Sequence, residues 1–156
     1  MTERELLLRA AELSRVHSLA GDGAPFGAVV ATPDGTVVAE GWNETFVAND
    51  PTAHAEVVAI RRATQALGRL DLSGHVIYAS CEPCPMCLGA IFWARLDRVV
   101  FANSREDAAR FGFDDAALYD EVARPLDARR IRCEHAPLDE ALDVFGEWAR
   151  WGGPAG

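Results

Sequence analysis

The sequence contains no lysine, and all 15 of its basic residues are arginines. Aspartate and glutamate number 24 together, so the formal net charge at pH 7 is −9. No run of arginines forms a local basic strip, whereas a protein that binds the phosphate backbone of nucleic acid needs a basic face. We interpret the missing lysine as a compositional bias, and the acidic balance argues against nucleic acid as a partner.

The chain also lacks long apolar runs and has few cysteines. No segment approaches the ~20 apolar residues that a membrane span requires, and the N-terminal segment is charged throughout, unlike a signal peptide. We therefore expect a cytoplasmic protein with reduced thiols, in which four cysteines indicate metal binding or chemistry more than disulfides. The 156 residues fit one domain, covering 1–156.

Hydrophobic periodicity and turn residues predict helices that alternate with strands. The expected helices cover residues 3–19, 50–67, 83–95 and 138–151, and the expected strands cover residues 26–31, 36–42, 75–80, 99–102 and 131–133. A Pro-Asp-Gly turn signal at 33–35 joins the first two strands into a hairpin, and the glycines and proline at 152–154 end the last helix. This order predicts an α/β fold, a three-layer α/β/α domain with a mixed central sheet of about five strands.

Two short stretches carry the candidate chemistry. His54 and the pair Cys84 and Cys87 supply one imidazole and two thiolates, which are good ligands for a tetrahedral zinc ion. Three protein ligands leave a fourth position for water, which separates a catalytic zinc site from a structural one. Glu56 is not needed as a ligand, so it is a candidate general base beside the metal.

The spacing of these residues requires a site beyond the ends of helices. In mid-helix, His54 and Glu56 would point in nearly opposite directions, so they can meet only near a helix N-terminus. Cys84 and Cys87 are three apart and share one helix face, again in a first turn. We expect two helix N-termini aimed at one metal, where their positive ends favour thiolates.

Cys81 extends the cysteine pair and raises the alternative of an iron–sulfur cluster. That pattern needs a fourth cysteine where this sequence has Ile91. We therefore predict that Cys81 is a small buried residue rather than a ligand, and that Cys133 is structural. A structural zinc module, closed by four ligands, is the alternative without catalysis.

The pattern His54-x-Glu56, followed by Pro83-Cys84-x-x-Cys87, is the signature of zinc-dependent base deaminases. Asn43 and residues 50–56 and 81–87 resemble the cytidine deaminase-like zinc fold. Within it, residues 87–95 and 112–115 resemble the bacterial guanine deaminases. The resemblance implies hydrolysis of guanine to xanthine and ammonia, with zinc as cofactor and Glu56 as the proton carrier.

The resemblance also implies substrate contacts and a subunit arrangement. The implied contacts are Asn43, Ala55, Asp115, Phe26, Trp93 and Trp148. A homodimer with exchanged C-terminal segments is implied too, with Glu147 as a second proton shuttle. The relatives end in an aromatic residue that reaches the site, whereas this chain ends in Gly-Gly-Pro-Ala-Gly. The alternatives are Trp148 or Trp151 as the lid, or a different lid residue.

The tRNA adenosine deaminases share Asn43 and both zinc stretches, and they are the main alternative. Such an enzyme must flip a base out of RNA and hold the flanking phosphates. The net charge of −9 and the lack of a basic C-terminal helix argue against this alternative. Deaminases of guanosine, cytosine or a triazine share the mechanism and stay open as alternatives.

Overall fold

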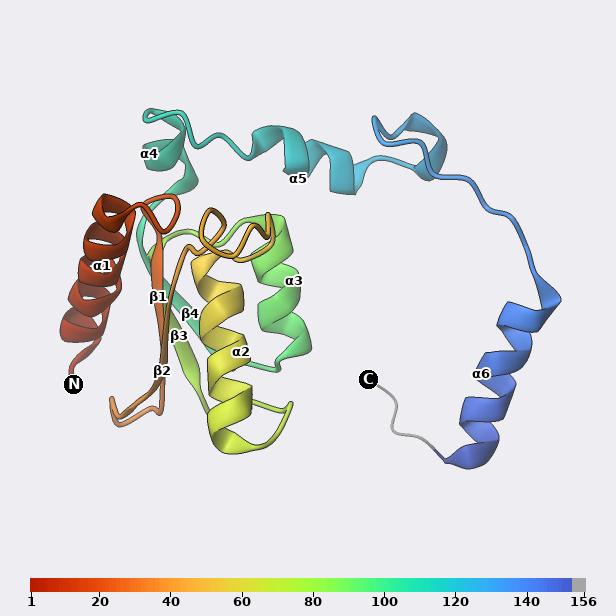
Figure 1. The fold of residues 1–156 in the computed structure, drawn as a ribbon, viewed down its shortest axis with the longest axis horizontal. Helices are drawn as coiled ribbons and strands as arrows, with labels where there is room; N and C mark the ends of the chain where they lie inside the picture. The colour runs from red at the N-terminus through yellow and green to blue at the C-terminus, as the bar shows by residue number, and fades with distance from the viewer. Residues whose placement is uncertain (153–156) are drawn as a thin grey trace. The chain divides into compact units, whose positions relative to one another are not determined.

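The computed structural model describes residues 1–152, and the chain divides into two compact units, Met1–Ala117 and Leu118–Gly156. The first unit contains a four-stranded sheet with the order β2-β1-β3-β4 (Figure 1). Its strands are β1 (Gly27–Ala31), β2 (Val37–Trp42), β3 (Val76–Cys81) and β4 (Arg98–Asn103). Strand β1 pairs antiparallel with β2 and β3, whereas β3 and β4 are parallel, so the sheet is mixed.

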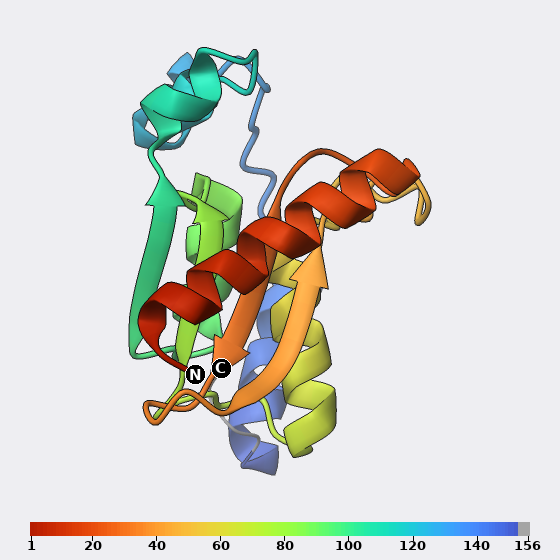
Figure 2. The same cartoon turned by 90° about the vertical axis from the view of Figure 1, so that its left-hand side faces the viewer.

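Helices cover both faces of this sheet. Helix α1 (Glu3–Ala20) crosses one face, and helices α2 (Ala55–Leu67) and α3 (Pro85–Trp93) cover the other (Figures 1 and 2). Side chains alternate along β1, so Val29 packs in the core under α1 while Val30 packs in the core under α2 and α3. The predicted three-layer α/β/α arrangement with a mixed sheet is confirmed.

Helix α1 begins and ends where its sequence predicts. Thr2 is the N-cap, and it forms a capping box with Glu5. Gly21 ends the helix with a φ of 88°, a left-handed conformation that glycine adopts without a steric penalty. Leu6, which is fully buried, anchors the inner face of the helix on the sheet.

Two helix starts differ from the sequence prediction. Asp50 does not cap α2, because its Oδ1 accepts hydrogen bonds from the backbone N–H and hydroxyl of Thr52, at 2.8 and 2.7 Å. This local turn delays the helix until Ala55. Helix α3 begins at Pro85 rather than at residue 83. Both shifts place the candidate metal ligands at the helix ends.

The predicted fifth strand at 131–133 is wrong, since the described residues form four strands. Ile131 is 74% exposed, and its N–H donates to the Glu121 carboxylate rather than to a neighbouring strand. The remaining elements are α4 (Arg105–Ala109), α5 (Ala116–Ala123), a 3₁₀ turn η1 (Leu126–Ala128) and α6 (Asp139–Trp151). The predicted last helix is therefore confirmed, and Gly153-Pro154 of its stop signal lie outside the described residues.

The second unit has no buried residue in its described part, 118–152. Helix α6 is apolar on one side, yet Leu142 is 67% exposed and Phe145 is 74% exposed. Residues 118–152 by themselves do not cover these side chains. Across the described residues, none of the helices is both long and apolar enough for a membrane span.

Candidate metal centre and substrate cavity

The ends of α2 and α3 meet at the candidate site, as the residue spacing predicts. His54 is the N-cap of α2, and Glu56 is the second residue of that helix. Cys84 is the N-cap of α3, and Cys87 is the third residue of that helix. The two helix starts therefore supply all four residues.

The side chains of His54, Cys84 and Cys87 form a group that fits a zinc ion. Nδ1 of His54 lies 3.7 Å from Sγ of Cys84 and 3.5 Å from Sγ of Cys87, and all three ligand atoms lie within 4.8 Å of one another. Ligands placed 2.0–2.3 Å from a tetrahedral zinc ion are roughly 3.3–3.8 Å apart. Within residues 1–152 this group has three members, which leaves a fourth tetrahedral position without a protein ligand.

Electrostatics at the group favour one thiolate before any metal binds. Hydrogen bonds from Cys87 and His54 lower the pKa of Cys84 to about 4, although burial opposes the shift. The hydrogen bond with Cys84 raises the pKa of His54. The same Cys84 contact, together with burial, raises the pKa of Cys87. A bound divalent cation would stabilise the second thiolate, because its charge outweighs these local effects.

Glu56 is a buried carboxyl group beside the ligand set. It is 7% exposed, and burial raises its pKa. The thiol of Cys87 donates to Oε2 of Glu56 at 3.4 Å. A carboxyl group with a raised pKa, beside a candidate metal site, holds a proton more readily than an ordinary glutamate and is a candidate proton carrier.

A cavity of about 310 Å³ opens onto this centre. It brings together three of the predicted substrate contacts, namely Phe26, Asn43 and Asp115, with His54, Glu56 and Cys84. Burial raises the pKa of Asp115, and the nearby Cys84 thiolate raises it further. The volume lies within the range of small-molecule sites.

The other predicted contacts do not line this cavity. Trp93 on α3 is 70% exposed, and Ala55 is buried at the start of α2. Trp148 and Glu147 belong to α6 in the second unit, where both are exposed.

Several cavity residues had no role in the sequence analysis. These are Ala24, Thr45, Glu82, Arg105, Ala108 and Phe113. Glu82 and Phe113 carried a signal, because they belong to the 81–87 and 112–115 stretches, and the Phe113 ring meets that of Phe26 edge-on with centroids 5.2 Å apart. The rest come from loops and helix ends that only the tertiary fold brings together.

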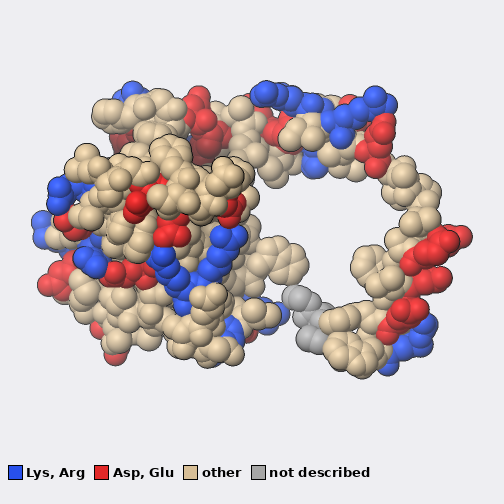
Figure 3. All heavy atoms as spheres, in the orientation of Figure 1, with Lys and Arg blue, Asp and Glu red and all other residues tan. Residues whose placement is uncertain are grey.

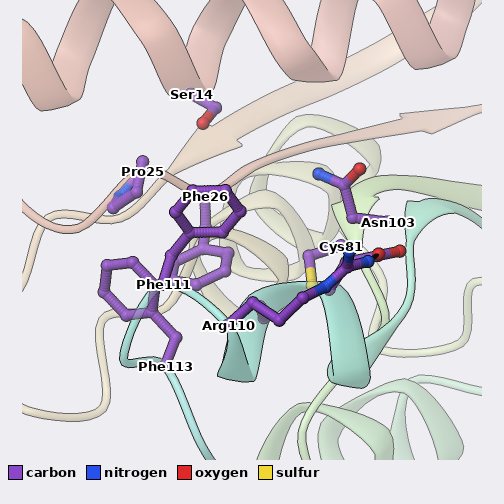
Figure 4. A pocket seen from close by; sticks show the side chains of 10 residues that line it. Ser14, Pro25, Phe26, Cys81, Asn103, Arg110, Phe111 and Phe113 are labelled. Atoms are coloured by element: carbon purple, nitrogen blue, oxygen red, sulfur yellow. Dashed lines mark hydrogen bonds and ion pairs between the residues drawn. The ribbon is translucent and has the colours of Figure 1, made fainter.

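A second cavity of about 440 Å³ adjoins the first, and Figure 4 shows the phenylalanine rings that gather along it. The two cavities share Phe26, Cys81 and Phe113. Cys81 is buried, as predicted, and burial raises its pKa to about 11, which keeps it a neutral thiol. It is not a member of the His54 group. Cys133, predicted to be structural, is exposed.

Comparison with known proteins agrees with this geometry. Residues 1–103 match the family described as the cytidine and deoxycytidylate deaminase zinc-binding region. The guanine deaminase of Bacillus subtilis (strain 168) is 47% identical over 95% of this chain and 94% of its own length. An X-ray structure of guanine deaminase from Bacillus subtilis superposes with a TM-score of 0.92 and 47% identity, covering 96% of this chain and 95% of that chain.

A tRNA-specific adenosine deaminase from Haemophilus influenzae is more distant, with 35% identity over 72% of this chain and 68% of its own length. The family match spans the sheet, its covering helices and both ligand stretches. Together with the ligand group at the ends of α2 and α3, it establishes that the chain belongs to the cytidine and deoxycytidylate deaminase family of zinc-dependent hydrolases.

Proposed function

We propose that this chain hydrolyses guanine to xanthine and ammonia. The observation that carries the proposal is the cavity in which buried Glu56 lies beside the ligand group of His54, Cys84 and Cys87. The 47% identity to the guanine deaminase of Bacillus subtilis, over most of both chains, favours guanine as the base. The reaction balances as guanine plus water giving xanthine plus ammonia.

His54, Cys84 and Cys87 would hold the zinc ion, and Glu56 would move the protons. Zinc, when bound, supplies a Lewis acid that lowers the pKa of water in its open position. Glu56 would take a proton from the attacking water at Oε2 and deliver it to a ring nitrogen of the base. It would then take the second proton from the hydroxyl added to the ring carbon and deliver it to the departing amine, which leaves as ammonia. Its burial suits this relay, because a raised pKa makes Glu56 a stronger base than an ordinary glutamate.

The cavity walls would orient the base. Phe26 offers a ring face, while Asn43 and Asp115 offer polar groups. Ala55 does not line the cavity, but its N–H is among the first of α2, where backbone donors have no partner inside the helix, so we propose it as a further contact. Trp93 lies outside this cavity and would reach a substrate only from a second subunit.

We also propose a homodimer in which the C-terminal helices are exchanged, so that residues 1–156 act as one zinc-dependent deaminase domain completed by a second copy. The support is the exposed apolar side of α6, which an isolated chain leaves open to water. In the dimer, Trp148 would close the cavity of the other subunit and Glu147 would be a second proton shuttle. Sedimentation analysis of the purified protein tests the dimer.

We place the enzyme in the cytoplasm, because its ligand cysteines must stay reduced to bind zinc. All four cysteines are free thiols in the structure. On the face drawn in Figure 3, arginine and acidic side chains are interspersed over residues 1–117, which favours a small-molecule substrate over RNA.

A panel of ammonia-release assays tests the proposed reaction. Zinc-loaded protein is incubated with guanine, guanosine, cytosine, adenine and the triazine ammeline, and inosine formation in tRNA is measured in parallel. We expect about one zinc ion per chain and turnover fastest with guanine. Zinc-loaded protein that forms inosine in tRNA but releases no ammonia from guanine would refute the proposal.

A further inference from the structure

The Asn43 side chain is buried and held at one end only. It is 4% exposed, and its Oδ1 accepts three hydrogen bonds. The backbone N–H of Ala24 donates at 3.1 Å, the backbone N–H of Thr45 at 3.2 Å, and the hydroxyl of Thr45 at 2.7 Å. A carbonyl oxygen has two lone pairs, so this end of the amide has no capacity left for a substrate.

These donors also fix the direction of the amide. Two of them are backbone N–H groups, which cannot accept a hydrogen bond. Rotating the amide by half a turn would therefore set the amino group of Asn43 against the N–H groups of Ala24 and Thr45. A flipped state would lose both backbone hydrogen bonds and leave the N–H groups of Ala24 and Thr45 without this acceptor.

Gly23 closes the same end sterically. A Cβ atom at Gly23 would lie 2.2 Å from Oδ1 of Asn43 and 2.4 Å from its backbone carbonyl oxygen. Only a glycine lets the chain pass this close to Asn43. We call Gly23, Ala24 and Thr45 the carboxamide socket.

The other end of the amide is left for the cavity that holds Glu56 and Phe26. The hydrogen bonds of the Asn43 side chain within residues 1–152 all involve Oδ1, so Nδ2 is without a protein acceptor there. An amino group without a protein acceptor that lines a cavity can donate to a ligand atom with a lone pair.

We propose that the carboxamide socket makes Asn43 a donor-only recognition group, so that this corner of the cavity selects amino-heterocycles that present a ring or carbonyl acceptor to Nδ2. The inference rests on the proposed function and deepens it. Guanine carries such acceptors at O6, N3 and N7. Gly23 and Thr45 are positioning residues, because they act on the substrate only through the orientation of Asn43.

The decisive comparison is Asn43→Asp against Asn43→Ala. In N43D one carboxylate oxygen keeps the socket bonds, while the other turns an acceptor toward the acceptor of the base. We expect kcat/KM for guanine to fall by about 100-fold or more in N43D, and at least as far as in N43A, with unchanged zinc content and melting temperature. If Asn43 served only to brace its loop, N43D would stay near wild type while N43A fell; that order overturns the proposal.

Thr45 gives a milder test with a matched rescue. Thr45→Val removes the hydroxyl donor but keeps the shape and both backbone donors, so we expect KM for guanine to rise about 3- to 10-fold with kcat nearly unchanged. Thr45→Ser should restore the wild-type KM. Gly23→Ala should lower kcat/KM at least about tenfold through displacement of Asn43, provided that it still folds and binds zinc. A wild-type KM in T45V that folds normally counts against the positioning role.

The orientation of the Asn43 amide can also be determined without an activity assay. In a crystal structure of the zinc-loaded wild type with 8-azaguanine, we expect Nδ2 within roughly 3.2 Å of a ligand acceptor and Oδ1 in the socket. Oδ1 facing a ligand N–H overturns the proposal. If the wild type releases no ammonia from guanine but deaminates another base, the proposed function is refuted and the proposal about Asn43 is not. The same variants are then assayed on that base.

Discussion

Replacing Glu56 by glutamine separates the proton carrier from the metal site and from the fold. The substituted side chain keeps nearly the volume of Glu56 and leaves His54, Cys84 and Cys87 intact, so the E56Q variant should load zinc normally. Its amide cannot hold a transferable proton. General acid–base catalysis contributes about 10²–10⁴-fold, and we expect kcat for guanine to fall by that factor.

The same substitution has a predictable effect on stability in the metal-free protein. Burial raises the folded-state pKa of Glu56 above its ordinary value of 4.5. The stabilising contribution of this group is therefore complete below about pH 4.5 and is lost as the pH rises through the folded pKa. A glutamine side chain carries no charge to desolvate, so metal-free E56Q should melt no lower than the metal-free wild type at pH 7.

Steady-state ammonia release, zinc analysis and thermal melts of metal-free protein between about pH 4 and 8 test both effects. Glu82→Gln is the matched control, because Glu82 lines the same cavity but accepts from the backbone N–H of Arg105, a bond that glutamine preserves. We expect kcat of E82Q for guanine to stay within about threefold of the wild-type value. An E56Q variant that binds zinc and turns over within about tenfold of wild type would rule out the role of Glu56, whatever its melting temperature.

Three further outcomes are expected. Cys84→Ser should lose most bound zinc and all measurable turnover, since it removes a thiolate ligand; metal analysis after dialysis tests this, and full occupancy would contradict the ligand set. Gly41→Ala should lower the free energy of unfolding, measured in urea, by about 1–3 kcal/mol, because a Cβ there would lie 2.3 Å from the carbonyl oxygen of Ala55. The control is Gly89→Ala on the exposed surface of α3, which should be neutral or stabilising. Phe145→Asp on α6 should shift the sedimenting species toward monomer, and an unchanged dimer would exclude the apolar side of α6 from the interface.

Local chemistry allowed much of the first unit to be predicted from sequence. Helix α1 follows from the apolar spacing of its inner face and from Gly21, and the hairpin follows from its turn residues. The candidate ligand set followed from residue type, from spacing and from a match to the known signature of zinc-dependent base deaminases. These features depend on contacts within a few turns or on the chemistry of one side chain.

The features that the sequence did not predict depend on competition between local signals or on contacts between residues far apart in the chain. Asp50 has the features of a helix cap, but its side chain closes a turn with Thr52, so α2 starts later. The run at 131–133 has β-forming residues, yet no described strand pairs with it. An amide carries both a donor and an acceptor, and only the fold shows that Ala24 and Thr45 already occupy the acceptor of Asn43.

The proposed metal ligands at the starts of α2 and α3 exclude one common way of stabilising a helix. His54 and Cys84 hold N-cap positions, and neither makes a side-chain capping hydrogen bond. Serine or aspartate at such a position commonly adds roughly 1 kcal/mol to a helix. Neither helix of this chain can be stabilised in this way, because a residue that caps the helix better would remove a proposed zinc ligand. Substitutions that raise thermal stability must therefore lie at other positions.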